Sequence, residues 1–171
     1  MSSRSEVVVR DHWLSGAERR RTRNYSPRPA AAVVSLVVVH GISLPPGRFG
    51  TGCVAEFFCN ELDWSAHPSF ASIEGVRVSS HLFVTRRGAV TQFVPFDQRA
   101  WHAGVSSYAG VADCNDYAIG IELEGTDEVA YTRSQYGRLA GIIDALMSAY
   151  PAISLGRIVG HNAVSYTHLR A

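Results

Sequence analysis

The longest apolar run of the chain predicts a β-strand that is buried on both faces. Residues 33–39 are aliphatic apart from one serine, and a near-continuous run of this kind is typical of a strand inside a sheet that is covered on both sides. Gly41 and the pair Pro45-Pro46 end the run. His40 is therefore expected at the carboxyl end of this strand.

Apolar positions at helical spacing predict two helices. Residues 51–62 carry the first pattern, with Thr51 as the expected N-cap. The second pattern starts at Thr132 and runs to about Tyr150, where Pro151 stops it. Its apolar positions are Tyr136, Leu139, Ile142, Ile143 and Leu146.

Shorter segments between these elements predict further strands. Residues 81–85 and 89–94 flank the turn Arg86-Arg87-Gly88, which indicates a hairpin. Residues 117–123 and 157–159 are strand candidates, whereas residues 64–75 have the character of a loop. The alternation of strands and helices predicts a single α/β domain built around one sheet.

Composition narrows the class of protein. The chain has 171 residues, 46% of them hydrophobic and 18% charged, which fits one globular domain. A net charge of +1 gives no reason to expect nucleic acid as a partner. Three cysteines make a disulfide framework improbable and favour a reducing compartment. Residues 1–29 show no signal-peptide core, and the apolar run is too short for a membrane span, so we expect a cytoplasmic protein without a membrane partner.

Two histidines follow predicted strands directly. His40 stands in Val-Val-Val-His-Gly and His161 in Ile-Val-Gly-His-Asn. A side chain just past a buried strand emerges at the rim of the sheet, where open α/β folds bind ligands, and neutral imidazole is a preferred ligand of zinc. The spacing alone leaves two interpretations open, a pair of metal ligands or two ordinary residues at the sheet edge.

Paired carboxylates mark the strand at residues 117–123. Glu122 and Glu124 point to the same face of a strand, and an unpaired buried charge is costly. One interpretation is a general base or acid beside a metal-bound water. The other is an edge strand with a solvated face.

Residues 95–116 form a long segment rich in glycine, serine and aspartate, which makes it a candidate binding loop. Within it, Trp101 and His102 could form a wall for a sugar or a peptide, although a loop aromatic is also common in a satellite core. His67 and His81 lack a comparable context and are interpreted as structural.

Several long segments resemble one known family, the cytoplasmic 1,6-anhydro-N-acetylmuramyl-L-alanine amidases of the AmpD type. The resemblance covers about residues 12 to 162 and includes Trp-His-Ala-Gly at 101–104 and Gly-Ile-Glu-Leu-Glu at 120–124. The other matching segments are residues 13–17, 26–29, 37–50, 77–81, 94–100, 114–119, 125–127 and 160–161.

The resemblance implies a mixed central β-sheet flanked by helices, and a monomer that binds a small muropeptide and a single zinc ion. It implies hydrolysis of the amide between anhydro-N-acetylmuramic acid and L-alanine during cell-wall recycling. His40 and His161 match the zinc ligands of the family, and Glu122 matches its catalytic carboxylate. Arg77, Trp101 and His102 fall in segments that border the substrate groove of the family.

The resemblance ends at about Asn162. The family has an aspartate as third zinc ligand in a Lys-x-Asp-Pro-Gly segment after the second histidine, and neither that aspartate nor the lysine follows His161 here. His168 matches the missing ligand poorly, and Gly41 replaces an asparagine common in the family. We therefore divide the chain into an N-terminal segment that packs on the domain (1–29), an amidase domain (30–162) and a tail that does not match the family (163–171).

Two other hypotheses stay open. The chain could be a muropeptide-binding domain that does not cut, or an amidase inactivated by its altered tail. An amidase acting on intact peptidoglycan is disfavoured by the missing signal peptide, and a domain that only binds protein partners has no support in the sequence.

Overall fold

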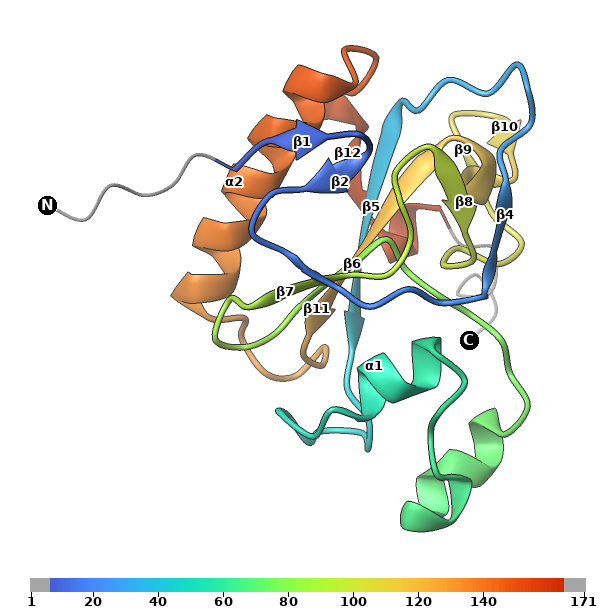
Figure 1. Ribbon diagram of the computed structural model, residues 1–171, viewed down its shortest axis with the longest axis vertical. Helices are drawn as coiled ribbons and strands as arrows, with labels where there is room; N and C mark the ends of the chain where they lie inside the picture. Colours follow the sequence, from blue (N-terminus) through green and yellow to red (C-terminus); the bar gives the residue numbers. More distant parts are fainter. Residues whose placement is uncertain (1–6, 165–171) are drawn as a thin grey trace, which may run out of the picture.

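The computed structural model describes residues 7–164, which fold around a mixed β-sheet (Figure 1). The helices are α1 (Cys53–Phe58) and α2 (Arg133–Ala149), with 3-10 helices at Trp64–Ala66, Pro68–Ile73, Cys114–Asp116, Leu155–Arg157 and His161–Ala163. The strands are β1 (Val9–Arg10), β2 (Trp13–Leu14), β3 (Glu18–Arg19), β4 (Tyr25–Pro27), β5 (Leu36–Ile42), β6 (Leu82–Val84), β7 (Val90–Gln92), β8 (Gln98–Ala100), β9 (Ser107–Tyr108), β10 (Val111–Ala112), β11 (Ala118–Glu124) and β12 (Ile158–Gly160).

Six strands form the central sheet in the order β12-β5-β11-β6-β7-β3. The first four are parallel to one another, β7 runs antiparallel to β6, and β3 runs parallel to β7. This arrangement confirms the predicted α/β domain with a mixed sheet. The segment before β5 contributes β3 to the sheet edge, while β1 and β2 pair with each other and β4 pairs with β8.

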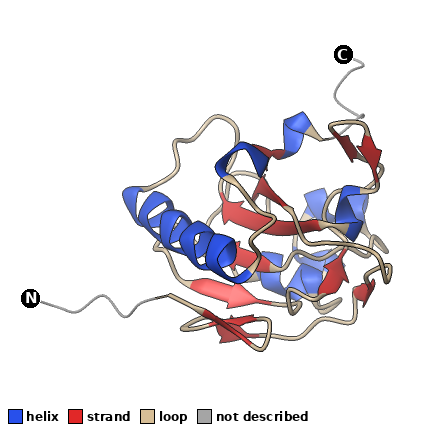
Figure 2. Ribbon diagram, turned by 90° about the horizontal axis from the view of Figure 1, so that it is seen from above, coloured by secondary structure: helices blue, strands red, loops and turns tan. Residues whose placement is uncertain are grey.

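The two faces of the sheet are covered by different elements (Figure 2). On one face, Ile142 and Leu146 of α2 pack with Val37, Ile119 and Ile121 of the sheet. Complete burial of an aliphatic side chain stabilises a fold by about 1.5–3 kcal/mol. On the other face, the phenylalanines of α1 pack against β6. Ala103, Cys114 and Tyr117 pack there against β5 and the start of β11.

Helix α2 begins and ends as the sequence predicts. Thr132 is the N-cap and forms a capping box with Gln135, because the Gln135 N–H donates to Thr132 Oγ1 at 3.1 Å and the Thr132 N–H donates to Gln135 Oε1 at 3.0 Å. Tyr136, one of the apolar positions of the helical pattern, is 58% exposed, whereas Gln135 and Ala145 are buried.

The central strand predictions hold with shifted boundaries. Strand β5 starts at Leu36 and ends at Ile42, so His40 lies within the strand rather than after it. Strand β11 has every residue buried between β5 and β6, which makes the interpretation of a solvated edge strand wrong. The hairpin of β6 and β7 is confirmed, with Gly88 in the turn at φ +81°.

Two local predictions are wrong: the extent and N-cap of the first helix, and the loop at residues 64–75. The first helix is shorter than predicted, and Gly52 rather than Thr51 is its N-cap; Thr51 Oγ1 donates instead to the Leu44 carbonyl. The helix ends before Asn60, whose φ of +61° is incompatible with a helix. Residues 64–75 form two 3-10 helices instead of an irregular loop. Residues 95–116 carry three short strands and a 3-10 helix: β8 pairs with the distant β4, and β9 and β10 pair with each other.

Candidate functional site

Three adjacent strands bring His161, His40 and Glu122 to the same edge of the sheet. Glu122 of β11 is the register partner of His40 of β5, so their side chains point to the same face. His161 follows β12, whose last residue pairs with Val39 next to His40. Three residues that are far apart in the chain thus meet where the parallel strands end, at the edge where ligands of α/β sheets bind.

The two predicted ligand histidines lie side by side. The centroids of the His40 and His161 rings are 4.7 Å apart. His40 is 8% exposed, and its burial, together with the charge of His161, lowers the pKa of His40 to about 3. The His40 imidazole is therefore neutral at physiological pH, which is the form that binds a metal.

Glu122 is a buried carboxyl group with a raised pKa. Burial raises the pKa of Glu122 to about 8, because charging a carboxylate away from water is unfavourable. Its Oε2 has no hydrogen-bond partner within residues 7–164. A buried acid with its pKa near neutrality is a candidate general acid or base.

The neighbouring Glu124 has a different environment. Its Oε1 accepts a hydrogen bond from the Gly50 N–H at 2.5 Å, and its Oε2 accepts one from the Arg86 N–H at 3.0 Å. Glu124 therefore joins the loop before α1 to the hairpin turn and has a structural role. The sequence singled out Glu124 only as the neighbouring carboxylate of Glu122.

His102 lies against His40. His102 Nδ1 is 3.0 Å from His40 Nε2, at hydrogen-bonding distance. Burial, followed by the charge of His40, lowers the pKa of His102 well below its usual value.

A cavity of about 330 Å³ opens beside these residues. Its lining contains four of the residues that the sequence singled out, namely Arg77, Trp101, His102 and Glu122. Trp101 is fixed by a hydrogen bond from its Nε1 to Ser26 Oγ at 3.2 Å, and Arg77 is exposed. Ile42, Phe58, Ser79 and Asn115 also line this cavity. The sequence offered no signal for them, because apolar and small polar residues carry no local signature of a site.

The other histidines that the sequence singled out serve the fold. His81 is fully buried, and its Nδ1 accepts a hydrogen bond from the Gly120 N–H at 3.0 Å. His67 Nδ1 accepts a hydrogen bond from the Ser69 N–H at 3.2 Å and caps a 3-10 helix. Both contacts agree with a structural interpretation.

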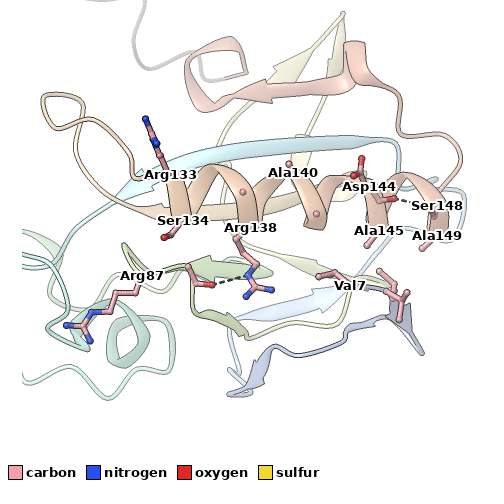
Figure 3. A pocket seen from close by; sticks show the side chains of 15 residues that line it. Val7, Arg87, Arg133, Ser134, Arg138, Ala140, Asp144, Ala145, Ser148 and Ala149 are labelled. Carbon is pink, nitrogen blue, oxygen red and sulfur yellow. Dashed lines mark hydrogen bonds between the residues drawn. The ribbon is translucent and has the colours of Figure 1, made fainter. Parts of the chain in front are cut away.

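A larger hollow of about 910 Å³ lies away from this site, between β1 and the outer surface of α2 (Figure 3). Small and charged side chains line it, and Arg138 Nε donates to the Gly88 carbonyl at its rim. Because α2 covers the sheet face opposite to His40 and Glu122, this hollow has no part in the site described above.

Metal coordination by this site is incomplete within the described residues. Residues 7–164 contain no group of three histidine, cysteine, aspartate or glutamate side chains arranged to hold a metal ion. His168 and most of the tail at 163–171 lie outside the described residues. Among the helices of residues 7–164, none has the length and apolar character needed to cross a membrane.

Comparison with known proteins gives consistent matches. Residues 29–169 match the family described as N-acetylmuramoyl-L-alanine amidase. The 1,6-anhydro-N-acetylmuramyl-L-alanine amidase AmpD of Citrobacter freundii is 50% identical over 155 residues, which cover 91% of this chain and 82% of that protein.

Solved structures extend the match to the fold. The crystal structure of a selenomethionine AmpD derivative superimposes with a TM-score of 0.90 at 48% identity, covering 94% of this chain and 89% of that chain. The amidase AmiD of Escherichia coli, solved in complex with the substrate anhydro-N-acetylmuramic acid-L-Ala-D-gamma-Glu-L-Lys, has a TM-score of 0.53 at 22% identity. This second match covers 93% of this chain and 58% of that chain, and it bears on the fold alone.

Proposed function

Since the chain belongs to the N-acetylmuramoyl-L-alanine amidase family, we propose that it hydrolyses the amide between anhydro-N-acetylmuramic acid and L-alanine of muropeptides, in cell-wall recycling. The observation that carries the proposal is the meeting of His161, His40 and Glu122 beside a cavity. The name of the relative from Citrobacter freundii supports the anhydro form of the sugar.

Zinc is the cofactor that this proposal requires, with His40 and His161 as two of its ligands. Two adjacent imidazoles, one of them deeply buried, suit the preference of zinc for nitrogen. A catalytic zinc ion takes three protein ligands, and the third is not among residues 7–164. When bound, zinc would acidify a water molecule and polarise the scissile carbonyl.

Glu122 is the residue that moves the proton in this proposal. Its carboxylate accepts a proton from the attacking water, and the resulting carboxylic acid gives a proton to the departing amine of L-alanine. Burial raises the pKa of Glu122 to about 8 in the metal-free protein, and a nearby cation would lower it toward neutrality.

The cavity residues bind and orient the muropeptide. The Trp101 ring, held by Ser26, presents an apolar wall on which a sugar ring can stack. The exposed guanidinium of Arg77 can pair with a carboxylate of the peptide. His102 completes the wall next to His40.

The remaining features of the proposal have coarser support. The family match over residues 29–169 supports an amidase domain that starts near residue 30, and it extends past residue 162, so it does not support a division of the chain there. The pairing of β3 with β7 and of β4 with β8 supports residues 7–29 as a segment that packs on the domain. Three unpaired cysteines support a reducing compartment such as the cytoplasm. We propose a monomer whose partner is the muropeptide alone, without a nucleic acid or a membrane.

The direct test is to incubate the purified chain, with zinc added, with anhydro-muramyl tripeptide and to follow the free tripeptide by mass spectrometry. We expect release that a chelator abolishes and that added zinc restores. Release that persists in excess chelator would contradict the metal-dependent reaction.

A second candidate function follows from one observation, the lack of a three-ligand group within residues 7–164. A domain of this kind would bind muropeptides without cutting them. Calorimetric binding of the tripeptide substrate without any release at saturating zinc would identify this function, or an amidase that its altered tail has inactivated.

A further inference from the structure

The hydrogen bond between His40 and His102 determines which nitrogen of His40 is open. The bond joins His40 Nε2 to His102 Nδ1 at 3.0 Å, and the two rings meet edge to face with centroids 5.1 Å apart. Because His40 Nε2 is engaged, Nδ1 is the nitrogen of His40 that remains for a metal.

The position of His102 is fixed by close packing and by its backbone. A Cβ atom added at Gly120 would lie 2.3 Å from His102 Cγ, so the ring rests directly on the backbone of β11. Asn115 Oδ1 accepts hydrogen bonds from the N–H groups of His102 and Ala103, at 3.0 and 2.9 Å. His102 therefore cannot shift away from His40 without disturbing the sheet or this loop.

The buried Nε2 of His102 has no hydrogen-bond partner within residues 7–164. No other protein group there therefore determines which ring nitrogen of His102 carries the hydrogen. Two imidazole nitrogens form a hydrogen bond only when one carries a hydrogen and the other does not. If His40 binds a metal through Nδ1, that nitrogen carries no hydrogen, and the hydrogen of the neutral ring is on Nε2. His40 Nε2–H then donates to His102 Nδ1.

We propose that His102 is a positioning residue for the metal ligand His40: it accepts the hydrogen bond from His40 Nε2–H and so holds Nδ1 of His40 toward the metal. The inference rests on the proposed function, in which His40 is a zinc ligand. Partners of ligand histidines fix both the tautomer and the ring orientation, and losing one typically lowers metal affinity by about 10–100-fold.

Two conservative variants separate this role from simple packing. In His102→Asn, the side-chain oxygen can take the place of Nδ1 and still accept the hydrogen bond from His40. In His102→Gln, the amide reaches the place of Nε2 and leaves the place of Nδ1 without an acceptor. Both variants remove the ring, so a purely structural role predicts similar losses of stability and of metal affinity in the two.

The first measurement uses the metal-free protein labelled with ¹⁵N-histidine, with His40→Gln as the assignment control. We expect His40 to be the Nε2–H tautomer in the wild type and in His102→Asn, and to lose that preference in His102→Gln. An Nδ1–H tautomer of His40 in the wild type overturns the proposal.

The second measurement is the zinc affinity, from competition with a chromophoric chelator, together with the melting temperature of each variant. We expect His102→Asn to keep affinity within about threefold of the wild type and His102→Gln to lose about 10–100-fold. Equal affinities in the two variants overturn the proposal. If the wild type binds zinc but does not cut muropeptide, only the proposed function is contradicted. If zinc does not bind, the tautomer of His40 in the metal-free protein still tests the role of His102.

Discussion

Replacing Gly120 by alanine perturbs the site through a single methyl group. Gly120 lies in the middle of β11, and its φ is not positive, so alanine brings no backbone strain at this position. The new Cβ would meet His102 Cγ at 2.3 Å, His102 Cδ2 at 2.5 Å and His102 Nδ1 at 2.7 Å. The imidazole must therefore move.

The size of the movement follows from these distances. Ordinary contacts of a Cβ atom begin at 3.4 Å, so the ring has to shift by about 1 Å, which is the overlap that must be relieved. Overpacking of this kind costs about 1–3 kcal/mol of stability. A displacement of about 1 Å next to a catalytic group can cost about 100-fold in rate. Since the ring also contacts His40, we expect zinc affinity to fall as well.

Urea unfolding, zinc competition and tripeptide release measure the three effects of Gly120→Ala. Gly137→Ala is the matched control, because Gly137 lies in α2 with nothing within 4 Å of an added Cβ. This control should gain about 0.5–1 kcal/mol of stability and keep full activity. A Gly120→Ala protein as stable and as active as the wild type would refute the reasoning.

Three further predictions concern stability and its dependence on pH. Thr132→Ala removes the N-cap of α2 and should cost about 1 kcal/mol in urea unfolding, whereas Thr132→Ser should lose less. Glu124→Ala leaves the N–H groups of Gly50 and Arg86 without their carboxylate acceptor and should cost about 1–3 kcal/mol of stability per unsatisfied group. The activity of Glu124→Ala per folded molecule should exceed that of Glu122→Gln. An equal loss of activity in the two variants would contradict the structural role of Glu124. Because the folded pKa of Glu122 is about 8 against an ordinary 4.5, the folded state retains a proton that the unfolded state releases. The free energy of unfolding of the metal-free protein should therefore fall as pH rises from about 4.5 to 8, and a fall of the same size in Glu122→Gln would exclude this carboxyl as its source.

The sequence predicted the elements whose pattern is set by burial. The apolar runs of β5 and β11 and the helical spacing of α2 are direct consequences of packing on a sheet, and all three elements are confirmed. Their boundaries shifted where a polar residue continued a strand, as at His40, because pairing with Glu122 in the neighbouring strand extends β5.

The predictions for the loops were less accurate, because hydrogen bonds that the sequence pattern does not reveal determine their structure. Thr51 Oγ1 accepts a hydrogen bond from the Cys53 N–H and donates one to the Leu44 carbonyl, but the N-cap is Gly52, whose φ is +83°. Within residues 95–116, β8 pairs with the distant β4, and periodicity in a single segment cannot reveal such a partner.

The candidate site was also only partly predictable from the sequence. His40, His161, Glu122 and Trp101 were singled out from their types and contexts, and Arg77 from the family resemblance. The structure brings His40, His161 and Glu122 to one edge of the sheet. Glu122, Trp101 and Arg77 line one cavity. The contact of His102 with His40 was not predictable, since it depends on the absence of a side chain at Gly120 and on the backbone contacts of Asn115.

The most direct test of the account compares the wild type with Glu122→Gln, both loaded with zinc and given anhydro-muramyl tripeptide. Glutamine keeps the shape of the buried side chain but can neither accept nor return a proton. The account predicts that the wild type releases free tripeptide, and that the variant binds zinc and muropeptide while releasing none. Release by Glu122→Gln at the rate of the wild type would contradict it.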